Sequence, residues 1–180
     1  NASPTVSTAY VITALDSASG CTADETVQVD VVNVVLGVVI GPLNLCLGDS
    51  LQLSVSGADS YAWSPAASLS DSTGSTVQAG PDTTTQYTIT GYDTLHGCSG
   101  TVGLLVIVHP LPVVGFDLAD PEFCTTDSDL PLTSGTPTGG VYSGPFVSAG
   151  VFSPSNAGPG TYQLTYTYTD PNGCDAAATD

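Results

Sequence analysis

The sequence predicts an all-β protein built from small tandem β-sandwiches, with almost no helix. Three observations support this prediction: apolar residues alternate with polar ones, turn residues recur roughly every eight to twelve positions, and long segments repeat. Thr, Ser, Val and Gly dominate the composition, whereas the residues that favour helix surfaces are scarce.

The charge balance excludes two classes of partner. The chain has no Lys or Arg and 17 acidic residues, which gives a net charge of -17. Binding to nucleic acid needs Lys or Arg at the phosphates, and an anionic lipid surface repels such a chain. The longest apolar run, 31–40, is far shorter than the roughly 20 residues that span a bilayer. We therefore expect no nucleic-acid partner and no membrane insertion.

Internal repetition organises the chain. A shift of 77 residues aligns the following pairs: Pro4 and Pro81, Tyr10 and Tyr87, Ile12 and Ile89, Thr13 and Thr90, Asp16 and Asp93, Gly20 and Gly97, and Cys21 and Cys98. A third copy follows at a similar spacing, in which Cys124 aligns with Cys46 and Cys174 aligns with Cys98. The register predicts the C-terminal part of one repeat at 1–36, a whole repeat at 37–110, and a third repeat at 113–180 whose last strand is truncated.

Within the whole repeat, the pattern has the period of two that is typical of half-buried strands. We predict strands at 51–55, 61–63, 76–78, 84–90 and 101–108, with the last two forming a hairpin. About seven short strands in about 75 residues predict an immunoglobulin-like Greek-key sandwich. Trp63 is predicted to be a core residue rather than a platform for sugar stacking.

The five cysteines follow the same register. Each repeat has one cysteine early and one at its last hairpin, which predicts two disulfides within repeats, Cys46 with Cys98 and Cys124 with Cys174. The partner of Cys21 is then expected outside this sequence. Free buried thiols are the alternative, and metal ligation is disfavoured because no CxxC spacing occurs.

Several motifs resemble a known family. The segments YAWSPAASLSD, GPDTTTQYTITGYD and GPGTYQLTYTYTDPNGC are similar to the PKD-like and Ig-like repeats of giant Bacteroidota surface adhesins and gliding-motility-associated proteins. The resemblance implies a secreted or cell-surface bacterial protein whose repeats act as stalks, spacers or adhesive surfaces. In the third repeat Tyr142 stands where Trp63 is expected, which indicates a sister repeat type.

The same resemblance implies O-glycosylation, because acceptor sites in that phylum read Asp, then Ser or Thr, then a small aliphatic residue or Thr. The matching acceptors all fall in predicted turns and are Ser17, Ser50, Ser72, Thr83 and Thr94. Chance matches in a chain so rich in Ser and Thr are the alternative.

The sequence predicts no required cofactor. Calcium is the possible ion that the acidic clusters suggest, since hard oxygen ligands at repeat junctions can bind it. The candidate ligands surround the start of the third repeat and are Asp117, Asp120, Glu122, Asp127 and Asp129. Ordinary solvated surface carboxylates are the alternative, and no DxDxDG loop is present.

No catalytic constellation stands out, so the sequence predicts a protein that is not an enzyme. A disulfide-stapled stalk or spacer is the expected function. The alternatives are a subunit of an extracellular filament and a carbohydrate-binding module. The expected partners are neighbouring repeats of the same or identical chains, with surface glycans or other cells as further candidates.

Overall fold

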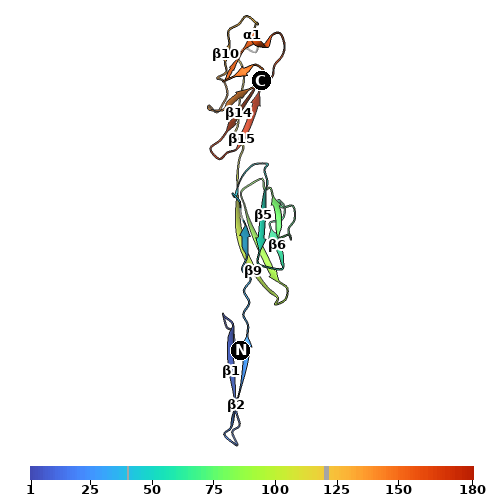
Figure 1. The fold of residues 1–180 in the computed structure, drawn as a ribbon, viewed down its shortest axis with the longest axis vertical. Coiled ribbons are helices and arrows are strands. Elements are labelled where there is room, and N and C mark those ends of the chain that lie inside the picture. Colours follow the sequence, from blue (N-terminus) through green and yellow to red (C-terminus); the bar gives the residue numbers. More distant parts are fainter. Residues whose placement is uncertain (40, 120–121) are drawn as a thin grey trace. The chain divides into compact units, whose positions relative to one another are not determined.

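The computed structural model describes residues 1–39, 41–119 and 122–180, and it confirms the all-β prediction (Figure 1). In these residues the only helix is the single turn α1 (Pro154–Ala157). The chain divides into two compact units. Unit 1 comprises Asn1–Pro42, Leu51–Ala79 and Gln86–Leu105, and unit 2 comprises Leu43–Ser50, Gly80–Thr85 and Val106–Asp180. These units cut across the predicted repeats, whose boundaries stay a prediction.

The first repeat contributes one antiparallel hairpin, β1 (Thr8–Leu15) with β2 (Thr22–Val29). Its apolar side chains are largely open to solvent: Ile12 is 57% exposed, whereas Ile89, its counterpart in the second repeat, is 0% exposed. The hairpin therefore has the apolar pattern of strands that face a core. In the described chain, no other strands cover that apolar face.

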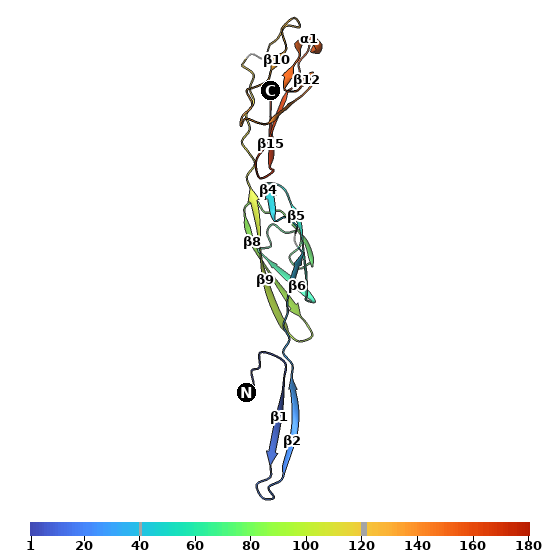
Figure 2. The same cartoon turned by 60° about the vertical axis from the view of Figure 1, so that its left-hand side comes forward.

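The described residues of the second repeat contain the expected seven strands. They are β3 (Gly37–Val39), β4 (Asn44–Cys46), β5 (Leu51–Ser56), β6 (Ser60–Ser64), β7 (Thr76–Ala79), β8 (Thr85–Asp93) and β9 (Cys98–His109). One sheet has the order β3-β5-β7, and the other has the order β4-β9-β8-β6. Strand β4 runs parallel to the last residues of β9, so that Cys46 lies opposite His109 (Figure 2). Two such sheets from one Greek-key chain form an immunoglobulin-like sandwich.

Burial in the second repeat follows the predicted alternation. Leu53 and Val55 in β5 are buried, as are Tyr87 and Ile89 in β8. Trp63 in β6 is 3% exposed, and its indole N–H donates a 2.8 Å hydrogen bond to the backbone oxygen of Gly74. The prediction that Trp63 is a core residue is confirmed.

Where the structure describes the third repeat, it has six shorter strands: β10 (Leu130–Pro131), β11 (Val141–Ser143), β12 (Val147–Ser148), β13 (Val151–Phe152), β14 (Thr165–Thr169) and β15 (Asp175–Thr179). They form the sheets β10-β13-β12 and β11-β14-β15. The buried core consists of Phe116, Leu132, Phe152, Leu164 and Tyr166. Tyr142, which replaces the expected tryptophan, is half-buried, and its ring centroid lies 4.6 Å from that of Tyr166. Aromatic packing therefore takes the place of the single indole.

Candidate functional site

A disulfide joins a cysteine of the predicted second repeat to a cysteine of the predicted third repeat. Cys46, the last residue of β4, is bonded to Cys174, which directly precedes β15, with the two Cα atoms 5.5 Å apart. The two residues are 128 positions apart in sequence, and both belong to unit 2. The predicted pairing of Cys46 with Cys98 and of Cys124 with Cys174 is therefore wrong. Cys98, Cys124 and Cys21 carry free thiols.

The geometry of β9 rules out a bond between Cys46 and Cys98. Cys98 is the first residue of β9, whereas Cys46 lies opposite His109, the last one. A strand of this length separates the two positions by about 35 Å, at about 3.3 Å per residue. Disulfide formation needs Cα atoms within about 7 Å. The two cysteines of the second repeat thus lie at opposite ends of the same strand.

In the third repeat, Cys124 and Cys174 are likewise not bonded to each other. The backbone N–H of Leu118 donates a 2.6 Å hydrogen bond to the Asp180 carboxylate. Thr125, next to Cys124, lines one pocket with Leu118 and Asp180. Cys174 lies at the other end of β15, about 20 Å along the strand at its usual rise. Cys124 therefore belongs to the segment that borders this pocket, whereas Cys174 is not among the residues that line it.

The surroundings of the bridge bring together residues that the sequence did not connect. Cys174 is fully buried. On the side of Cys46, the ring of His109 lies 3.4 Å from the side-chain oxygen of Asn44. The positive charge that His109 carries when protonated acts on Asp170. No spacing pattern in the sequence pointed to a role for His109 beside a disulfide.

Asp170 holds the turn that presents Cys174. Its carboxylate accepts hydrogen bonds from the backbone N–H groups of Asn172 and Cys174, at 2.8 and 2.9 Å. These bonds favour the charged carboxylate, the one from Cys174 most strongly, and the charge on His109 adds to them, so the pKa of Asp170 lies below its ordinary value of 3.8. Asp16 and Asp93 form turns in the same way as Asp170, since each of the three accepts a backbone N–H two residues further on.

The lowered pKa of Asp170 predicts a pH dependence with a definite sign. The folded form binds a proton at Asp170 more weakly than the unfolded form does. The ionised carboxylate therefore stabilises the turn at pH values above the unfolded pKa of 3.8, and this stabilisation is lost as the pH falls through the lower folded pKa. In a ¹⁵N NMR titration, the amide signals of Asn172 and Cys174 should shift together with a midpoint below 3.8. Asp170→Asn should abolish the shared shift, and a midpoint above that value would contradict the assignment.

The described candidates for calcium ligands do not form a metal-binding group. The Asp127 carboxylate accepts the backbone N–H of Cys124 at 2.7 Å, and the Asp129 carboxylate accepts the Ser153 hydroxyl at 2.6 Å. Asp120 lies outside the described residues, and Asp117 and Glu122 are exposed. In the part of the chain that the structure describes, no group of three or more His, Cys, Asp or Glu side chains could hold a metal ion. Calcium binding stays a prediction.

All five predicted glycosylation sites lie between strands. Ser17, Ser50, Thr83 and Thr94 are exposed, and Ser72 is half-exposed. The hydroxyl of Thr94 donates a 2.9 Å hydrogen bond to the Asp59 carboxylate, so a glycan there would replace that bond. Their modification stays a prediction.

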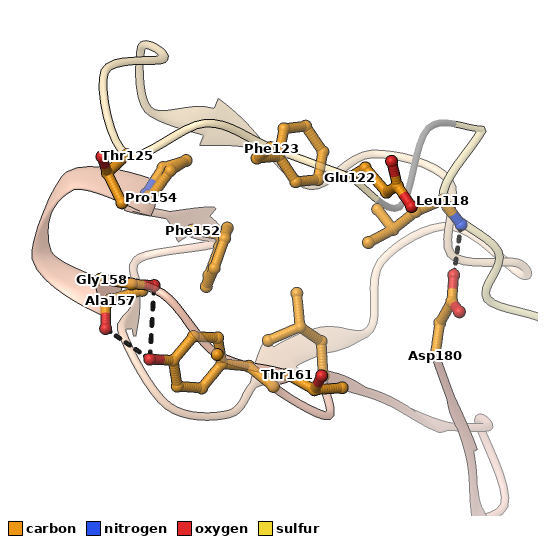
Figure 3. Close-up of a pocket in the computed structure, with 13 residues that line it drawn as sticks. Leu118, Glu122, Phe123, Thr125, Phe152, Pro154, Ala157, Gly158, Thr161 and Asp180 are labelled. Carbon is orange, nitrogen blue, oxygen red and sulfur yellow. Dashed lines mark hydrogen bonds between the residues drawn. The ribbon is translucent and has the colours of Figure 1, made fainter.

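A pocket of about 550 Å³ opens in the third repeat (Figure 3). Phe123 and Phe152 line it with their ring centroids 6.3 Å apart, and Phe152 is equally close to Tyr162. The hydroxyl of Tyr162 donates a hydrogen bond to the backbone oxygen of Ala157. The rings are tilted against each other, and Phe152 is buried, so they pack together and do not form a flat exposed platform for a sugar.

No protein-family model matches this chain, and a search of curated proteins finds no significant match. In the described residues no helix is long and apolar enough to cross a membrane. The features of the chain itself, above all the bridge between Cys46 and Cys174, therefore carry the functional argument.

Proposed function

We propose that this chain is a segment of tandem immunoglobulin-like repeats that acts as a disulfide-stapled stalk or spacer in an exported, cell-surface bacterial protein. The observation that carries the proposal is the bond between Cys46 of the second repeat and Cys174 of the third. A bond inside one domain stabilises only that domain. A bond between successive repeats also prevents them from being pulled apart along the chain, which is what a spacer under tension requires.

Export is supported by the disulfide, because such bonds persist mainly in oxidising compartments. The bacterial surface is supported by the resemblance of the repeats to PKD-like arrays. A net charge of -17 without any Lys or Arg keeps such a spacer soluble and repels it from anionic surfaces. No part of the proposal requires catalysis or a bound cofactor. Its partners are neighbouring repeats of the same or identical chains.

Single-molecule stretching tests the load-bearing role. When the chain is pulled from its two ends, the bridge carries the tension past the segment between Cys46 and Cys174. Because that segment spans 128 residues, the fully stretched oxidised chain should be about 440 Å shorter than the reduced chain. The same experiment after chemical reduction is the control.

Two results would contradict the proposal. One is an oxidised chain that extends as far as the reduced chain, since the bridge would then carry no load. The other is specific, saturable binding to one glycan that is lost when pocket residues such as Tyr162 are replaced by alanine. That result would favour the carbohydrate-binding alternative.

A further inference from the structure

Three cysteines remain unbonded, and each of them has a counterpart in the bridge that forms. Cys21 and Cys124 are exposed, and Cys98 is half-exposed. The observed bond joins the early cysteine of one repeat, Cys46, to the hairpin cysteine of the next, Cys174. The remaining thiols belong to the same two classes: Cys124 is an early cysteine, and Cys21 and Cys98 are hairpin cysteines.

The structure supports the equivalence of the hairpin cysteines. In each hairpin an aspartate carboxylate accepts the N–H of the residue two positions on, at 2.9 Å for Asp16, 3.0 Å for Asp93 and 2.8 Å for Asp170. In each case the cysteine then begins or directly precedes the second strand of the hairpin. Cys98 therefore occupies the place in the second repeat that the bonded Cys174 occupies in the third.

The early cysteines are equivalent in the same way. The backbone N–H of Asp49 donates to the oxygen of Cys46 at 3.0 Å, and that of Asp127 donates to the oxygen of Cys124 at 2.9 Å. Both cysteines therefore start the same four-residue turn. In both classes the unbonded member is more open to solvent: Cys98 is half-exposed where Cys174 is fully buried, and Cys124 is exposed where Cys46 is half-exposed.

We propose that Cys98 and Cys124 are halves of two further bridges of the same kind, each made with another repeat of this type. Cys124 forms a disulfide with the hairpin cysteine of a following repeat, and Cys98 forms one with the early cysteine of a preceding repeat. Cys21 belongs to the hairpin class with Cys98. The inference rests on the observed bond and the repeat register, and it holds whether or not the chain acts as a stalk. In this pattern the early cysteine of each repeat is bonded to the hairpin cysteine of the next, so that every repeat is bonded to both neighbours.

The chemistry is thiol–disulfide exchange with a small-molecule disulfide as the oxidant. The thiolate of one cysteine attacks that disulfide and releases one small thiol, which leaves a mixed disulfide on the protein. The second cysteine thiolate then attacks the protein sulfur and releases the other small thiol. Two protein thiols lose two protons and two electrons in total, and the electrons reduce the small disulfide to two thiols.

A second copy of the chain serves as the neighbouring repeat in the test. The purified full-length chain is held at high concentration in a buffer of reduced and oxidised glutathione, and linked peptides are then identified by mass spectrometry. Digestion uses a protease that cleaves at Asp, because the chain contains no Lys or Arg for trypsin. Linkages from Cys124 to Cys98 or Cys21 should exceed hairpin-to-hairpin linkages by roughly tenfold.

Random reaction of the three thiols would instead give mixed and hairpin-to-hairpin linkages in equal amounts, and that result would overturn the proposal. Matched single variants sharpen the test. Cys124→Ser should lower dimer formation roughly tenfold. By contrast, Cys98→Ser and Cys21→Ser should each leave the other hairpin cysteine to react. Dimer formation by Cys124→Ser at the wild-type rate would also overturn the proposal, and circular dichroism checks that each variant is folded.

Discussion

Trp63→Ala is expected to lower the free energy of unfolding of the second repeat by about 3–5 kcal/mol. The indole is 3% exposed in β6, where Trp63 lies opposite Ile89 of β8. Its removal leaves a cavity that rigid neighbouring strands fill only in part. The substitution also removes the 2.8 Å hydrogen bond to the backbone oxygen of Gly74. An acceptor left without a partner adds to the loss.

Hydrogen exchange with mass spectrometry measures this effect by repeat, which matters because a multidomain chain need not unfold in one step. Faster exchange should be confined to the strands of the second repeat. Tyr92→Ala in β8 is the matched control, since that side chain is 42% exposed and its loss should change stability by only about 0.5 kcal/mol. Equal effects of the two substitutions would contradict the assignment of Trp63 to the core. Fluorescence is unsuitable, because Trp63 is the only tryptophan.

The fold of the second repeat was largely predictable because the signal is local. Leu53 and Val55 alternate with polar residues, and such a pattern can bury one face only as a strand. The turn at Asp93 was equally readable, since an aspartate side chain there can bond the next backbone N–H groups. In the third repeat the strands are short, so each offers few alternating positions from which it could be predicted. An aromatic cluster around Tyr166 also replaces the indole there.

The disulfide was not predicted, because pairing depends on which end of a strand each cysteine occupies. Sequence spacing placed Cys46 and Cys98 in one repeat and suggested that they meet. The parallel pairing of β4 with the end of β9 places Cys46 beside His109 instead. The length of the apolar strand after Cys98 could have indicated this. The two ends of that strand lie more than three times as far apart as the roughly 7 Å between Cα atoms that a disulfide allows.

Cys46→Ala combined with Cys174→Ala is expected to destabilise the third repeat by about 2–5 kcal/mol, the usual effect of losing a native disulfide. The bond closes a loop of 128 residues, so it removes many conformations from the unfolded chain. Alanine is the suitable replacement because Cys174 is fully buried and a serine hydroxyl there would lose its contact with water. Denaturant unfolding followed by hydrogen exchange in β14 and β15 measures the change.

Cys98→Ala and Cys124→Ala are the controls that distinguish the two pairing schemes. If the observed bond is the native one, each substitution removes only a free thiol and leaves the stability of its repeat nearly unchanged. If the bonds instead lay within repeats, Cys98→Ala would destabilise the second repeat and Cys124→Ala the third. A reducing agent should reproduce the effect of the double alanine variant in the wild-type chain and have no further effect on that variant. The stability of the third repeat then depends on a covalent bond to the repeat before it.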